Sequence, residues 1–189
     1  MGFLDGILGR SKPPKANLDV LFSVPQAALS LQAEGFAFSG RGAVCYRDSE
    51  GRADDEVLDD AEQMVRTDPS ASVERHTDPF GFSWFEVVRP GGDPAALITD
   101  LHAVNSTLAD AGFGTALLCS TMIFEQDGHR LALVYLFKRG TFYPFVPDPG
   151  AARRRDNPTE LRIRALVEKD IPIEPDLERW LAIWGAPGL

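Results

Sequence analysis

The stretch from residue 117 to residue 137 constrains the fold more than any other part of the sequence. Two apolar runs, residues 117–125 and 130–137, flank the dipeptide Asp127-Gly128. Asp-Gly readily adopts the positive φ angles of a two-residue β-turn, so the pattern predicts a tight hairpin. The second run contains LALVYLF and is apolar at successive positions. Such a strand needs cover on both faces, and we therefore expect it at the centre of a sheet.

The sequence also contains one strongly signalled helix, over residues 94–111. Asp93 is suited to cap its first turn, Pro94 fits its first position, and Gly112 is suited to end it. A second helix, acidic and amphipathic, is predicted over residues 53–66.

The remaining elements follow from turn residues and apolar spacing. Glu34-Gly35 predicts a turn between two strands, at 27–32 and 36–46. Further strands are expected at 73–75, 82–89 and 141–147, and further helices at 17–22, from 158 onward and at 175–184.

This order joins hairpins by helices instead of forming βαβ crossovers. It favours an α+β fold with one antiparallel or mixed sheet, and it suggests repeated ββα units. The length of 189 residues fits a single domain. Because Pro13 and Pro14 interrupt the chain early, we expect residues 1–16 to form a flexible amphipathic arm and residues 17–189 to form one α+β domain.

Composition excludes several classes of protein. The net charge of -9 and the pI near 4.8 argue against a nucleic-acid partner, which would require an excess of Lys and Arg. The longest apolar run, residues 131–137, is far shorter than the roughly 20 residues of a membrane-spanning helix. Cys45 and Cys119 lie in apolar stretches and no signal-peptide pattern precedes them, which indicates a reduced, cytoplasmic protein.

No sequence motif identifies an active site. Glycine-rich nucleotide loops, nucleophile elbows and paired Cys-x-x-Cys patterns are absent, and the three histidines are dispersed, so neither a metal nor a cofactor is expected. His102 and Ser106 lie four residues apart on a predicted helix, but no motif supplies the acid that a catalytic pair would need. We assign no catalytic residues, and the alternative remains a small-molecule-binding protein or enzyme with a pocket near His102 and Cys119.

Two parts of the sequence are candidates for binding a partner. If the start of the chain forms a helix, four apolar side chains gather on one face: Phe3, Leu4, Ile7 and Leu8. A second region places cations beside aromatic residues: Lys138, Arg139, Phe142, Tyr143, Arg153, Arg154 and Arg155. This basic-aromatic region could receive an acidic helix or lipid head groups, unless its aromatic residues are core and its arginines are solvated.

The C-terminal stretch ERWLAIWGAPGL is too apolar for a free tail. We expect it to pack back onto the body of the protein, with docking to a partner as the alternative.

Extended segments of the sequence resemble the actinobacterial PspA-associated protein family, PspAB. They run along nearly the whole chain: MGFLDGILGRSKP, TDLHAVNSTLADAGFG, LVYLFKRGTFYPF, RRDNPTELRIRA and IEPDLERWLAIWGAPGL. The resemblance implies association with PspA, the helical coiled-coil protein of the phage-shock envelope-stress response at the cytoplasmic membrane. It carries over no active-site residues. It therefore implies a non-enzymatic adaptor or regulatory protein in the cytoplasm, with peripheral contact to the inner face of the membrane and a homo-oligomer left open.

Overall fold

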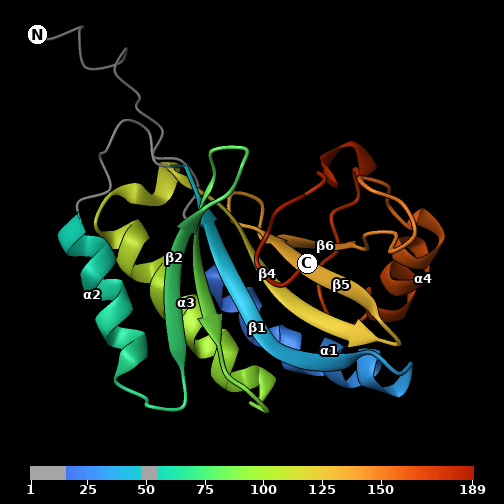
Figure 1. Cartoon of the computed structure of the whole chain (residues 1–189), viewed down its shortest axis with the longest axis horizontal. Helices are drawn as coiled ribbons and strands as arrows, with labels where there is room; N and C mark the ends of the chain where they lie inside the picture. The colour runs from blue at the N-terminus through green and yellow to red at the C-terminus, as the bar shows by residue number, and fades with distance from the viewer. Residues whose placement is uncertain (1–15, 48–54) are drawn as a thin grey trace, which may run out of the picture.

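A six-stranded sheet lies at the centre of the computed structural model, which describes residues 16–47 and 55–189 (Figure 1). The strands are β1 (Ala37–Tyr46), β2 (Ser72–Thr77), β3 (Ser83–Val88), β4 (Leu117–Gln126), β5 (His129–Leu136) and β6 (Thr141–Phe145). The sheet order is β2-β3-β1-β4-β5-β6, and all neighbouring strands are antiparallel. The helices of the described residues are α1 (Val24–Ala33), α2 (Asp55–Arg66), α3 (Pro94–Asp110) and α4 (Asn157–Val167). The predicted single-domain α+β fold is confirmed.

The hairpin of β4 and β5 is formed as the sequence predicts. Asp127 and Gly128 have φ angles of 48° and 81°, the positive values that a type I′ turn requires, and Gln126 pairs with His129. Leu131 through Tyr135 are fully buried, because both faces of β5 are covered. β5 is thus covered on both faces as expected, but it is fifth in the order of six strands, so the centre of the sheet is formed by β1 and β4 and not by β5.

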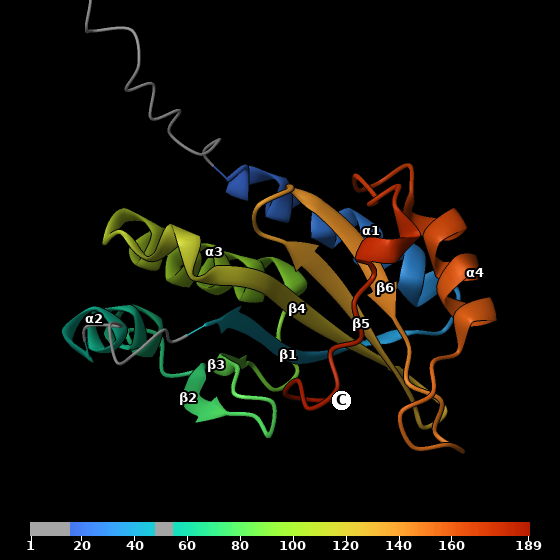
Figure 2. The ribbon, with the colours of Figure 1, turned by 90° about the horizontal axis from the view of Figure 1, so that it is seen from above.

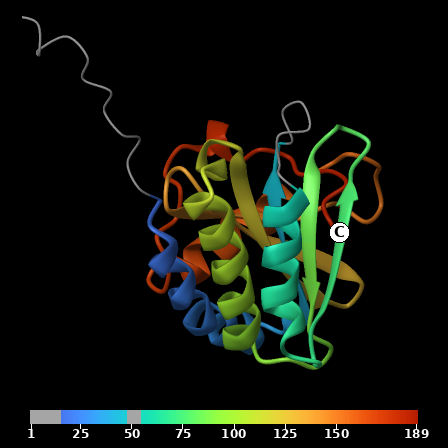
Figure 3. The ribbon, with the colours of Figure 1, turned by 90° about the vertical axis from the view of Figure 1, so that its left-hand side faces the viewer.

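Helices cover one face of the sheet. Figure 3 shows α1, α3 and α2 side by side over that face, and α4 packs against α1 and β6. Their buried side chains form the larger hydrophobic core, which includes Leu31, Leu101, Phe124 and Ile163. None of the helices in residues 16–47 and 55–189 has the length and apolar character needed to cross a membrane.

The α3 helix shows why its sequence signal was strong. The Asp93 carboxylate accepts a hydrogen bond from the backbone N–H of Ala95 at 3.2 Å, and Pro94 occupies the first turn. Gly112, with φ 95°, follows the helix in the left-handed region where a side chain would be strained. Both ends of α3 are thus set by neighbouring residues in the sequence.

The strand predicted at 27–32 is wrong, because these residues belong to α1. Pro25 lies in the first turn of this helix instead of ending one. Gly35, with φ 91°, ends the helix: its N–H reaches the Gln32 carbonyl, and the Phe36 N–H reaches the Leu31 carbonyl. These two bonds form a helix-terminating Schellman motif, so Glu34-Gly35 is a helix end and not a hairpin turn.

The helix predicted at 175–184 is also wrong, apart from one 3₁₀ turn at Leu177–Arg179. The carbonyl groups that would continue a helix bind side chains of the body instead. The Tyr143 hydroxyl donates to the Leu181 carbonyl at 2.9 Å, and Arg155 donates to the Trp180 carbonyl. The prediction that this stretch packs onto the body is confirmed, since Trp180 and Ala186 are buried in a second core on the other face of the sheet.

The grouping of strands differs from a repeated ββα unit. Along the described residues, one strand precedes α2, two precede α3 and three precede α4. The proposed arm lies outside the described residues except for Ala16, so its boundary with the body stays a prediction.

Candidate functional site

A cavity lined by described residues lies under the C-terminal segment, which we define as residues 174–189. This pocket has a volume of about 400 Å³, within the range of small-molecule sites. It is enclosed by the ends of β1, β4 and β5, by the loop between β2 and β3, and by residues 181–184 of the C-terminal segment. Figure 1 views this face with the segment crossing in front of the strands, and Figure 2 shows the chain end on the side of the sheet away from α3.

The walls of the pocket are aromatic and aliphatic. They include Phe82, Trp84, Leu118, Leu136 and Trp184. These residues come together because alternate positions of β3, β4 and β5 face this side, while the C-terminal segment closes over them. The Trp184 ring meets the Phe145 ring edge-on, with 4.9 Å between ring centroids, and this contact fixes one wall.

Asp78 organises the β2–β3 loop at the pocket. Its carboxylate accepts hydrogen bonds from Trp84 Nε1 at 2.9 Å, from the Phe80 N–H at 2.8 Å and from the Phe82 N–H at 3.0 Å. Burial works to raise the pKa of Asp78, but these hydrogen bonds outweigh it and hold the pKa below its usual value. The carboxylate is therefore ionised, and both of its oxygens already accept hydrogen bonds from the protein.

Two free thiols line the floor. Cys45 and Cys119 are directly opposite each other on β1 and β4, and both are buried. A hydrogen bond with Cys119 and burial together raise the pKa of Cys45 well above its ordinary value. Cys45 is consequently a neutral thiol at physiological pH, which makes it a poor nucleophile.

Tyr143 contributes a hydroxyl that is also engaged. It donates to the Leu181 carbonyl, and burial raises the pKa of Tyr143 above its usual value. The hydroxyl, carboxylate and thiol side chains that line the pocket are thus tied to partners within the protein. A ligand inside the pocket would therefore contact mainly apolar surface.

The structure buries both aromatic residues of the predicted basic-aromatic region. Phe142 is 0% exposed and belongs to the core on the helical side, while Tyr143 is 1% exposed and faces the opposite core. Neither side chain is available at the surface, as the alternative interpretation of this region anticipated.

The cations of that region are accessible but largely paired. Lys138 and Arg153 are exposed. Three arginines contact carboxylates: Arg139 with Glu174, Arg154 with Asp148 and Arg155 with Glu160, at N–O distances of 2.5, 2.6 and 2.9 Å. A partner of acidic character would therefore compete with internal carboxylates. The proposed binding residues Phe3, Leu4, Ile7 and Leu8 lie outside the described residues.

His102 and Cys119 do not share a pocket. His102 lies on α3 on the helical side, where its ring centroid is 5.0 Å from that of Phe22 and Nδ1 is 3.4 Å from Ser106 Oγ. Cys119 faces the opposite side of the sheet. There is a pocket at Cys119, but His102 does not line it, and its other lining residues were not predicted from the sequence.

A different group of side chains could hold a metal ion. Glu74, His76 and Glu86 place one ligand atom each within 4.8 Å of one another on β2 and β3. Sequence reasoning missed this group because Glu86 joins it only through the strand register, which sets it opposite Glu74. Arg41 Nη2 already binds Glu86 Oε1 at 2.7 Å, so a cation there would compete with a guanidinium.

Together, the six-stranded antiparallel sheet and its two cores define a single-domain α+β protein. A family model described as PspA associated protein B, PspAB, matches residues 1–188, and the chain belongs to this family. Neither the curated proteins nor the solved structures include a significant match to the chain.

Proposed function

We propose that this protein is a non-enzymatic adaptor or regulator that binds a PspA-like helical protein in the membrane-stress response. The observation that carries the proposal is the PspAB family match over residues 1–188, which links the chain to PspA. The pocket also supports a binding role over catalysis, because Asp78 is held by hydrogen bonds within the protein and the neutral thiol of Cys45 is a poor nucleophile.

The amphipathic arm is the first proposed contact. Leu4 and Leu8 lie on one predicted helical face with Phe3 and Ile7, and such a face suits docking against a helical partner. An arm with three glycines has little helix stability of its own, so it would fold on its partner.

The body offers a second proposed contact beside the paired arginines. Leu161 of α4 and Leu177 of the C-terminal segment are 48% and 51% exposed, and they line a groove of about 250 Å³ with Trp180 and Arg155. Exposed leucines that share a groove with Trp180 would suit the apolar face of an amphipathic helix.

The experiment is a titration of purified PspA from the same organism against the full chain, with anionic liposomes absent and then present. The variant Leu4→Asp/Leu8→Asp is expected to lose binding, because two charges interrupt the apolar face, with an unchanged melting temperature. Leu161→Asp/Leu177→Asp should weaken binding as well. Leu29→Asp is the matched control, since Leu29 is 61% exposed on α1 and outside both surfaces.

Two results would contradict the proposal. If the full chain does not bind PspA, with or without liposomes, the proposed direct contact with PspA is wrong. A large drop in melting temperature for Leu4→Asp/Leu8→Asp would show that the arm belongs to the core of the protein.

A further inference from the structure

The interior of the pocket under the C-terminal segment selects for apolar ligands. Its carboxylate, Asp78, accepts three hydrogen bonds from protein N–H groups, and its hydroxyl, Tyr143, is bound to a carbonyl. A polar metabolite that buried its donors and acceptors against these walls would leave them unpaired, which is unfavourable. Hydrocarbon or aromatic groups would instead contact Trp84, Leu118 and Trp184.

Two arginines lie over aromatic rings of the same pocket, and one of them, Arg47, lines the pocket itself. The guanidinium of Arg47 lies over the Phe82 ring, 5.6 Å from its centroid, and that of Arg153 lies over the Phe80 ring at 5.4 Å. Phe80 and Phe82 both line the pocket. Stacking on an aromatic ring leaves the edge of a guanidinium, with its N–H donors, free to bind an oxyanion. We call Arg47 and Arg153 the rim arginines.

The backbone at Arg153 also departs from ordinary geometry. Its φ of 54° lies in the left-handed region that residues other than glycine seldom enter. Strained positions of this kind concentrate at functional sites. A stacked, exposed arginine held in this conformation is an unusual feature in a chain with a net charge of -9.

We propose that this pocket binds a single-chain amphiphile, with its apolar chain between the aromatic walls and an oxyanionic head group at the rim arginines. Carboxylate and phosphate heads share the required chemistry. An amphiphile uses both features at once: the walls remove apolar surface from water, and the rim arginines pair with the head. The inference does not require PspA binding, because the pocket walls lie outside the arm and the groove proposed for that contact, although Arg153 also belongs to the basic-aromatic region.

The test is a titration of the full chain with dodecanoate, dodecyl phosphate, dodecanol and inorganic phosphate, each below its micelle concentration where one exists. Trp84 and Trp184 line the pocket, so intrinsic tryptophan fluorescence reports occupancy, and calorimetry gives the affinity. The two anionic amphiphiles should bind about ten-fold more tightly than dodecanol, the effect of one or two accessible ion pairs. Inorganic phosphate alone should not bind measurably. The tighter of the two anionic probes identifies the preferred head group.

Two sets of variants separate the parts of the site. Arg47→Ala/Arg153→Ala should remove the preference for dodecanoate over dodecanol and leave dodecanol binding unchanged. Arg130→Ala is the matched control, because Arg130 is an exposed arginine of β5 that pairs with Glu125 away from the pocket. Leu118→Trp should fill the pocket and block all three amphiphiles. Ile183→Trp, on the opposite wall, repeats this test if the first variant does not fold.

The inference is overturned if no amphiphile binds saturably, or if dodecanol binds as tightly as dodecanoate. It is equally overturned if folded Leu118→Trp and Ile183→Trp proteins bind dodecanoate like the unmodified chain. These outcomes are independent of the PspA titration, so the proposals of amphiphile binding and of PspA binding can fail separately.

Discussion

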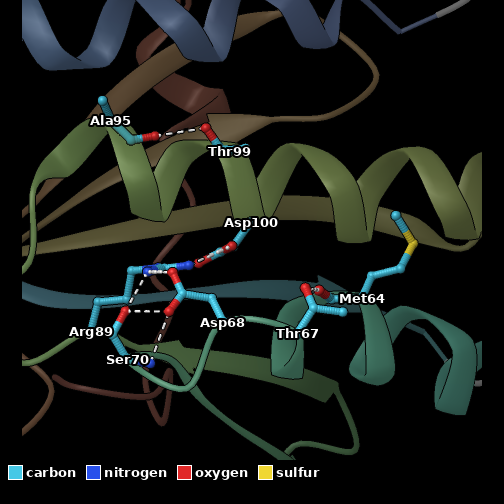
Figure 4. Close-up of polar contacts among 8 residues, drawn as sticks. All are labelled: Met64, Thr67, Asp68, Ser70, Arg89, Ala95, Thr99 and Asp100. Atoms are coloured by element: carbon cyan, nitrogen blue, oxygen red, sulfur yellow. Dashed lines mark hydrogen bonds and ion pairs between the residues drawn. The ribbon is translucent and has the colours of Figure 1, made fainter.

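Arg89 ties three separate parts of the chain together through one guanidinium. Its Nε and Nη2 bind the two carboxylate oxygens of Asp100 on α3, at 2.5 and 3.1 Å. Its Nη1 binds Asp68 Oδ2 at 2.7 Å and Ser70 Oγ at 2.9 Å, both in the loop after α2 (Figure 4). The Arg89 residue is 8% exposed, and so is Asp100, so both charges depend on this pairing.

This network makes stability depend on acid pH through Asp68. Hydrogen bonds from Arg89 and then Ser70 lower the pKa of Asp68 from 3.8 to about 2. Because the pKa is lower in the folded state, the stabilisation is complete above the ordinary pKa and is lost as the pH falls toward 2. We predict that Asp68→Asn flattens the dependence of the unfolding free energy on pH between 3.8 and 2.

Urea denaturation at a series of pH values measures this effect. Asp110→Asn is the control, because Asp110 is an exposed carboxylate at the end of α3. Equal slopes for Asp68→Asn and the unmodified chain in this pH window would show that the Asp68 contact does not stabilise the folded state.

At the scale of elements, the sequence predicts structure wherever the determining residues are neighbours. The ends of α3 and the turn of the β4–β5 hairpin depend on adjacent side chains, and they were predicted correctly. The α1 helix was not, because Gly35 can either turn a hairpin or end a helix. The bonds that decide this, from Gly35 and Phe36 back to the last turn, follow from the burial of Phe36 in the core.

The pocket could not be predicted for a related reason. Its residues come from six stretches of the chain, and strand register and the path of the C-terminal segment bring them together. Cys119 was predicted to lie near a pocket, but with His102, whereas the strand register sets it directly opposite Cys45. Alternating apolar residues in a strand indicate that one face of the sheet is buried. They do not show where the segment that covers this face leaves a cavity.

The contact between α3 and β1 depends on the absence of a side chain at Gly42. A Cβ at this position would lie 2.7 Å from the Thr121 carbonyl oxygen and 2.9 Å from Leu97 Cδ2. The backbone oxygen cannot move without disturbing the β1–β4 ladder. We therefore predict that Gly42→Ala lowers the free energy of unfolding by about 1–3 kcal/mol, the usual effect of overpacking.

Gly114→Ala is the matched control for Gly42→Ala. A Cβ at Gly114 would meet Ala109 at 3.9 Å, an ordinary contact. This control should be neutral or slightly stabilising, because alanine restricts the unfolded chain. Equilibrium urea denaturation compares the two variants, and equal stabilities would show that α3 can shift away from β1 without loss.

At the scale of the whole molecule, one sheet carries two covers of different kinds. Four helices cover one face, while the C-terminal segment, which has a single 3₁₀ turn, covers the other. Because such a segment makes few regular backbone hydrogen bonds, its position depends on side chains, and Trp180 is the largest of these buried ones. The cavity lies between this segment and the sheet, beside Leu181 and Trp184.

Trp180 and its neighbour Leu181 provide a matched test of this cover. Trp180 is 6% exposed, stacks on Tyr143 at 6.0 Å between ring centroids, and donates Nε1–H to the Glu174 carbonyl at 3.0 Å. Leu181, the next residue, is 62% exposed. We predict that Trp180→Ala lowers the free energy of unfolding by about 3 kcal/mol or more, and that Leu181→Ala changes it by less than about 0.5 kcal/mol.

Loss of Trp180 should also detach the C-terminal segment from the sheet while the four helices stay folded. Denaturant titration gives the free energies, and binding of a hydrophobic dye reports exposure of the sheet face that Trp180 normally covers. Trp180→Ala should bind the dye while its far-ultraviolet circular dichroism stays close to that of the unmodified chain, because the four helices lie on the opposite face. Loss of the helical signal together with the cover would instead show that the two cores fold as one inseparable unit.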